Sequence, residues 1–159
     1  MTRGARIGVL LGITAAAVTA SCVVPPIPQD PAYHRFADTR PLGGAPNGWA
    51  VVSNLPFLVV GLLGLRQVLM APVGASAPFV KSRERWPYAL FFAGVALTGV
   101  GSAYYHWAPD NARLVWDRLP MTIGFMALLA AVVAERVSVT AGIALLPVLL
   151  LAGAGSVAY

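Results

Sequence analysis

The sequence has few charged residues: they make up 11% of its 159 residues, whereas soluble domains carry about a quarter. Hydrophobic residues make up 58%. So little charge excludes an ordinary soluble globule, a disordered chain and a coiled coil. The sequence also has a single cysteine, Cys22, which excludes a disulfide scaffold. This composition is typical of an integral membrane protein.

Apolar stretches long enough to cross a bilayer recur along the sequence. A transmembrane helix needs about 20 mostly apolar residues, because each residue rises about 1.5 Å through roughly 30 Å of hydrocarbon. Five stretches reach this length, namely Ile7–Val24, Trp49–Leu69, Pro87–Trp107, Leu114–Ala134 and Ser138–Ala158. None alternates with period two, as the strands of a barrel do. We therefore predict an all-α polytopic bundle in the lipid bilayer, with residues 1–159 as a single transmembrane domain.

The first stretch has a second interpretation. Arg3 and Arg6, the apolar run and the small residues at Thr19–Cys22 imitate a secretory or lipoprotein signal. The other four stretches already place the chain in a membrane, so a retained helix is the simpler interpretation.

The basic residues indicate an orientation. The net charge is +5, and the basic residues lie between apolar stretches, where they act as topology signals rather than as a nucleic-acid surface. With Met1 inside, seven fall on the inner side and four on the outer side. The inner ones are Arg3, Arg6, Arg66, Lys81, Arg83, Arg85 and Arg136, and the outer ones are Arg35, Arg40, Arg113 and Arg118. This predicts a multi-pass protein of a bacterial-type inner membrane with its N-terminus inside.

A polar stripe runs along the third stretch. Gly94, Thr98, Ser102 and His106 recur every four residues and so share one helix face. Small residues at this spacing let helices approach closely, which is the simpler interpretation of Gly94 and Thr98. For Ser102, helix packing and a role in a functional site are both possible interpretations, because the stripe ends in a histidine. His106 is either a half-solvated residue of an aromatic belt or a functional group.

Asp117 follows shortly after a predicted tight turn at residues 108–111. It has two interpretations. It could cap the N-terminus of the fourth helix, where Pro120 would lie in the first turn. It could instead be a buried carboxylate that faces the polar stripe, since ionisable groups in a membrane usually line a site. The turn is short enough to bring Asp117 level with His106.

Serine, histidine and aspartate together suggest either a nucleophilic triad or a metal site. The sequence has no nucleophile elbow, and the spacing of the three residues favours the metal site. Imidazole is a good zinc ligand, and a carboxylate can deprotonate metal-bound water. One histidine does not hold catalytic zinc, and the only other one, His34, is interpreted as a solvated loop residue.

Two segments carry a resemblance to a known family. Gly101–His106, with Asp117–Met121 after it, resembles a signature of the alkaline ceramidases, and Asn47–Phe57 resembles the second signature of that family. The similarity runs from about Pro25 to the end. The family belongs to a group of seven-helix membrane hydrolases that includes the adiponectin-receptor-like proteins. The resemblance implies that these five spans are part of a seven-span fold.

The resemblance also implies roles for three residues. His106 matches a ligand of the catalytic zinc, Ser102 the serine beside the metal, and Asp117 the aspartate that acts on the water. The family's other two histidines form a pair on its last helix, and this sequence has no such pair. We therefore expect a truncated chain, inactive by itself, with two further ligands beyond residue 159.

The resemblance does not extend to calcium. Asn47 and Ala50 stand where the calcium-binding members of the family carry an acidic and a polar residue, and Asp38 is the only carboxylate nearby. No calcium site is predicted.

The predicted function is zinc-dependent hydrolysis of a lipid amide, ceramide, to a sphingoid base and a fatty acid. There are two alternatives: a non-catalytic membrane protein, in which the stripe packs helices and Asp117 caps one, and a related hydrolase that acts on another lipid.

Overall fold

The computed structural model describes residues 3–25 and 29–158, and within its helices the side chains of residues 3, 4, 6, 7, 10, 11, 21 and 158 lie outside the described set. The chain divides into two compact units, Met1–Asp30 and Pro31–Tyr159. The first unit contains α1, Arg3–Val23. The predicted span 7–24 coincides with this helix. Its crossing of a membrane stays a prediction, because several of its side chains are not described.

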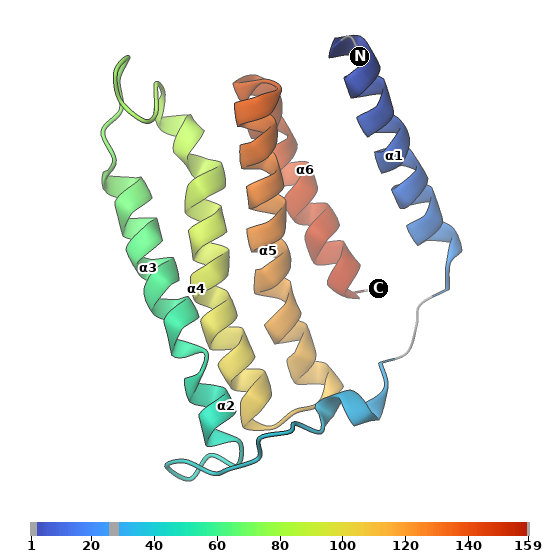
Figure 1. Cartoon of the computed structure of the whole chain (residues 1–159), viewed down its shortest axis with the longest axis vertical. Coiled ribbons are helices and arrows are strands. Elements are labelled where there is room, and N and C mark those ends of the chain that lie inside the picture. Colours follow the sequence, from blue (N-terminus) through green and yellow to red (C-terminus); the bar gives the residue numbers. More distant parts are fainter. Residues whose placement is uncertain (1–2, 26–28, 159) are drawn as a thin grey trace. The chain divides into compact units, whose positions relative to one another are not determined.

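The second unit is built from helices and confirms the predicted all-α bundle. Its long helices are α3 (Leu55–Met70), α4 (Trp86–Trp107), α5 (Asn111–Arg136) and α6 (Val139–Ala158), and its short ones are the 3-10 turns Pro31–His34 and Ser82–Arg85 and the helix α2 (Gly48–Val52). Figure 1 shows α3, α4, α5 and α6 side by side in chain order, each packed against the next. The loop before α2 and the turn between α4 and α5 lie at the same end.

The described residues include four helical segments that are long and apolar enough to cross a membrane: Gly48–Met70, Ser82–Trp107, Asn111–Arg136 and Val139–Val157. They coincide with the last four predicted spans. Large apolar side chains of these helices are exposed, among them Leu63, Val148 and Leu151. Water would disfavour such extended apolar faces and lipid would not, so the chain is a membrane protein.

The predicted second span is interrupted where α2 meets α3. The Ser53 hydroxyl donates to the Ala50 carbonyl over 2.7 Å, and the Asn54 amide donates to the same oxygen over 2.9 Å. These side chains compete with the backbone for its acceptors. Pro56 follows in the first turn of α3 and has no N–H to continue the ladder of α2.

The fourth span begins earlier than predicted, at Asn111 instead of Leu114. Asp110 ends the tight turn, and its carboxylate accepts from the Arg113 backbone N–H over 2.7 Å. An aspartate in extended conformation with this bond is a helix N-cap. The turn at residues 108–111 is therefore confirmed, and it orients α4 and α5 as an antiparallel pair.

Small residues let the long helices pack closely. A Cβ built on Gly94 of α4 would lie 2.6 Å from the backbone nitrogen of Gly124 in α5. This confirms the packing interpretation of Gly94. The Thr98 hydroxyl bonds within its own helix, to the Gly94 carbonyl over 2.8 Å. Further along α5, Ala127 and Ala130 are fully buried against Leu146 of α6.

Candidate functional site

The loop end of α4 and α5 brings Ser102 and Asp117 into contact. Ser102 is 8% exposed, and its hydroxyl donates to the Asp117 Oδ1 atom. The prediction that Asp117 faces the stripe is therefore confirmed, but its side chain is half-buried rather than buried, and its partner is Ser102, one turn before His106. The capping interpretation is wrong, because Asp110 caps α5 and places Asp117 and Pro120 inside the helix. The Asp117 carboxylate therefore bonds to Ser102, a member of the polar stripe.

The approach of the two helices at this point depends on a glycine. A Cβ on Gly101 would lie 2.0 Å from the carbonyl oxygen of Trp116, so only glycine fits here. Pro120 has no N–H, so it cannot supply the usual helical donor to the Trp116 carbonyl. Gly101 and Trp116 come directly before Ser102 and Asp117. The close approach of the two backbones at Gly101 and Trp116 therefore brings the side chains of Ser102 and Asp117 within hydrogen-bond distance.

His106 lies on the last turn of α4, one turn after Ser102. Its side chain is half-buried, and its Nδ1 atom is buried with no hydrogen-bond partner among the described residues. The ring of Phe36 lies over the imidazole, with the ring centroids 4.7 Å apart and the planes at 40°. The neighbouring Trp107 is 53% exposed. His106 is thus covered by the first loop, whereas Trp107 has the exposure of an aromatic belt.

His34 differs from its interpretation as a solvated loop residue. It is half-buried, and both ring nitrogens have partners: the Tyr105 hydroxyl at 2.9 Å from Nδ1 and the Asn111 Oδ1 atom at 2.9 Å from Nε2. An amide oxygen only accepts, so Nε2 carries a proton and Nδ1 of the neutral ring accepts from the tyrosine. In this arrangement His34 offers no free nitrogen to a metal ion.

The arrangement fits one position of a zinc site. A buried imidazole nitrogen without a partner is an available ligand, and such orphaned groups are rare in folded proteins. Histidine, cysteine, aspartate and glutamate nowhere gather in a group of three or more within the described part of the chain. Within residues 3–25 and 29–158, His106 thus has a ring nitrogen available to a metal ion. Its role as a zinc ligand, like the two further ligands implied by the resemblance, stays a prediction.

The geometry differs from that of a nucleophilic triad. In a triad the imidazole lies between the serine and the acid and bonds to both. Here the Ser102 hydroxyl donates directly to the carboxylate of Asp117. The serine therefore holds the carboxylate, as a residue that supports an acid–base group would.

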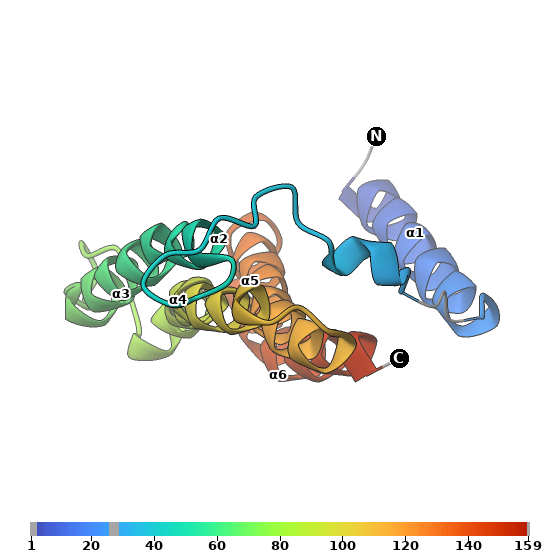
Figure 2. The ribbon, with the colours of Figure 1, turned by 90° about the horizontal axis from the view of Figure 1, so that it is seen from below.

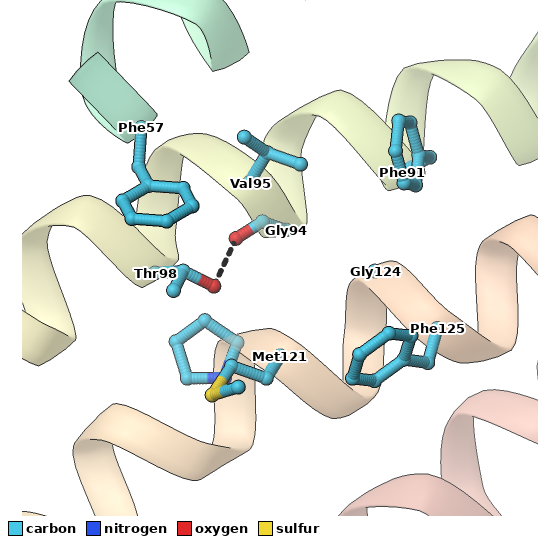
Figure 3. A pocket seen from close by; sticks show the side chains of 9 residues that line it. Phe57, Phe91, Gly94, Val95, Thr98, Met121, Gly124 and Phe125 are labelled. Atoms are coloured by element: carbon cyan, nitrogen blue, oxygen red, sulfur yellow. Dashed lines mark hydrogen bonds between the residues drawn. The ribbon is translucent and has the colours of Figure 1, made fainter.

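An apolar pocket lies along the same helix seam, beginning one turn from Ser102 and Asp117. Thr98 lies one turn from Ser102 and Met121 one turn from Asp117, and both line a cavity of about 200 Å³. Its walls come from α3, α4 and α5 and consist of Phe57, Phe91, Gly94, Val95, Thr98, Pro120, Met121, Gly124 and Phe125. Figure 3 shows Phe57 on one side of Thr98, with Met121 and Phe125 opposite α4. Its apolar lining suits a hydrocarbon chain.

The first loop also contains an ion pair outside the membrane-spanning helices. The Arg40 guanidinium donates to both carboxylate oxygens of Asp38, over 2.9 and 2.7 Å, and the Arg40 backbone N–H bonds to one of them. These bonds lower the pKa of Asp38 from 3.8 to about 2. The guanidinium also lies 5.6 Å from the ring centre of Trp49.

We expect the pairing of Asp38 with Arg40 to be lost in acid. The folded pKa is the lower one, so the bonds stabilise this loop above pH 3.8 and are lost as the pH falls toward about 2. A carbon-13 NMR titration of the aspartate carboxyls should show Asp38 titrating near 2, and Arg40→Gln should move that midpoint toward 3.8. A midpoint near 3.8 in the unaltered protein would contradict the pairing.

Two residues of the site, Phe36 and Asn47, were not assigned a role from the sequence. Asn47 is 9% exposed, and its amide donates to the His106 carbonyl over 2.9 Å. It lies in the second signature segment, which was the available signal. Nothing in the sequence pattern marks Phe36.

Comparisons with protein-family models, curated proteins and solved structures give no match. The geometry of Ser102, His106 and Asp117 is therefore the basis for a functional proposal.

Proposed function

We propose that the protein is a membrane-embedded hydrolase that cleaves a lipid amide, ceramide or a close analogue, with the help of zinc. The observation that carries the proposal is the bond from Ser102 to Asp117, with the unpartnered imidazole of His106 one turn away. An acid, a hydroxyl and a free imidazole nitrogen on adjacent helices are a combination suited to water activation.

Each of the three residues has a distinct task in this proposal. His106 would hold zinc together with the two further histidines that the resemblance implies. When bound, zinc would polarise the amide carbonyl and lower the pKa of a water molecule. The Asp117 carboxylate would take the proton from the attacking water and pass it to the leaving amine. Ser102 would keep that carboxylate oriented through its hydrogen bond.

The apolar pocket supports a lipid as the substrate. Its walls are almost wholly hydrocarbon, and it follows the helix seam away from Ser102 and Asp117 toward the other end of the bundle. An amphiphile could therefore place its polar amide at Asp117 and a hydrocarbon chain between Phe57 and Phe125. Substrate would enter sideways from the bilayer, where such lipids reside.

The proposal also includes the side of the membrane on which the site lies. With the N-terminus inside a bacterial-type inner membrane, as the distribution of basic residues favours, the loop end of α4 and α5 would lie on the outer side. Products would then be released at the outer leaflet.

His106→Ala is expected to abolish zinc retention and amide hydrolysis together, because it removes a metal ligand. The measurement uses the protein isolated from its own membranes: zinc per chain by elemental analysis, and release of labelled fatty acid from a ceramide in mixed micelles. The matched control is Tyr88→Phe, which removes the 2.6 Å bond to Glu135 at the opposite end of α4. The control should keep both properties.

The possible outcomes separate the alternatives. A protein that binds no zinc and hydrolyses no lipid would be non-catalytic, with Ser102 and Asp117 serving only to join two helices. If the protein hydrolyses a glycerophospholipid or a lipid ester but not the amide, the proposed site is correct and the proposed substrate class is wrong. Equal losses in His106→Ala and Tyr88→Phe would mean that the first variant acts through packing.

A further inference from the structure

The first loop, between the 3-10 turn Pro31–His34 and α2, passes over the end of α4. Figure 2, which views the bundle from the loop end, shows this segment crossing the end of α4. Two contacts join it to His106: the ring of Phe36 lies on the imidazole, and the Asn47 side chain bonds to the backbone. Next to them His34 bonds to Tyr105, which is 2% exposed. The loop is therefore attached to the last turn of α4.

The Asn47 bond compensates for the end of the helix. The last carbonyls of an α-helix have no donor four residues ahead. Helix α4 ends at Trp107, and Ala108 is extended with φ −151°. The His106 carbonyl is thus one of the oxygens that the helix leaves unsatisfied, and the Asn47 amide supplies a donor at 2.9 Å. The backbone of His106 is held by a residue 59 positions earlier in the chain.

The Phe36 ring acts on the side chain of the same histidine. The Nδ1 atom of His106 has no hydrogen-bond partner among the described residues, so no bond at that atom orients the imidazole. The Phe36 ring, 4.7 Å away, packs against the imidazole and also lies 5.7 Å from the ring of Tyr105. Aromatic contacts at such distances favour particular ring orientations.

We propose that Asn47 and Phe36 are positioning residues for His106: together they fix its backbone and its ring one turn from the Ser102–Asp117 bond. The use of this arrangement for zinc rests on the proposed function, but the positioning itself does not. Partners that orient a metal-binding histidine typically contribute 10- to 100-fold to metal affinity, so we expect about this loss of zinc affinity when Asn47 is changed.

Residues 1–159 contain two histidines, His34 and His106, and the test follows the signals of His106. The protein is labelled with carbon-13 and nitrogen-15 at histidine and reconstituted in lipid vesicles, and the His106 signals are identified by their loss in His106→Asn. Asn47→Ala is expected to lower the order parameter of the His106 backbone from about 0.85, the value of a rigid backbone, to below about 0.6, the flexible range. Asn47→Asp keeps the shape but replaces the donor with an acceptor, so it should act like Asn47→Ala.

Phe36→Leu provides an independent variant on the loop. It removes the aromatic ring from the face of the imidazole, so the His106 ring protons should lose an upfield ring-current shift. Phe79→Leu is the matched control, because Phe79 packs on Tyr88 at the other end of α4. Asn54→Ala is the control for Asn47, since Asn54 is equally buried and also donates to a backbone carbonyl, that of Ala50.

The controls decide the result. If Asn47→Ala and Asn54→Ala change the His106 signals equally, or if Phe36→Leu leaves them unchanged, the positioning proposal is overturned. Zinc affinity is then measured by competition with a chelator in the same samples. A protein that binds no zinc, but in which Asn47→Ala and Phe36→Leu change His106 alone, would retain the positioning and refute the proposed function.

Discussion

Asp117→Asn is expected to lower kcat/KM for amide hydrolysis by about 10²- to 10⁴-fold, the usual contribution of a general acid–base group. An asparagine oxygen can still accept the bond from Ser102, so the contact between α4 and α5 is kept. The amide group cannot take a proton from water at neutral pH. The variant therefore separates the chemical task of Asp117 from its structural one.

The measurement compares Asp117→Asn with Glu135→Gln, which neutralises a carboxylate at the far end of the same helix. Glu135 accepts a bond from Tyr88, as Asp117 does from Ser102, so the two variants are matched in kind. Zinc content and thermal stability should be unchanged in both, and hydrolysis should fall in Asp117→Asn alone. Full activity in Asp117→Asn would remove the carboxylate from the mechanism.

The long helices and one half of the site follow from local patterns. Apolar length sets the spans, and the four-residue spacing places Ser102 and His106 on one face of α4. The short turn capped by Asp110 then forces α5 to return beside α4, so that Asp117 faces this stripe. Each step depends on residues near one another in the sequence, so the spans, the stripe and the turn could be predicted, and the facing position of Asp117 was one of the two interpretations.

The contacts of the first loop could not be predicted in the same way. His34 reaches Tyr105 across 71 positions, and Asn47 reaches the His106 carbonyl across 59. A loop has no periodicity that fixes where its side chains lie. The prediction that His34 is solvated therefore rested only on its polarity and its place in a loop. The partner of Asp117 also depends on the residue at which α5 begins. The start of α5 at Asn111 gives Asp117 a place opposite Ser102 rather than at the helix terminus.

Gly101→Ala is expected to have the largest effect on stability in this part of the fold. The new Cβ would lie 2.0 Å from the Trp116 oxygen and 2.9 Å from its carbon, and both are backbone atoms that cannot rotate away. The helices must separate, at a cost of about 1–3 kcal/mol or more. Because Gly101 and Trp116 precede Ser102 and Asp117 directly, the same displacement should break the bond between those two residues and reduce hydrolysis.

Gly155→Ala is the matched control, because nothing lies within 4 Å of a Cβ at that position in α6. Alanine favours a helix over glycine, so this control should be neutral or slightly stabilising. Unfolding of both variants in mixed detergent micelles gives the difference in free energy, and a lipid assay on the same samples gives the activity. If Gly101→Ala is as stable as Gly155→Ala, then α4 and α5 do not meet at the Trp116 carbonyl. The contact between Ser102 and Asp117 would then need another explanation.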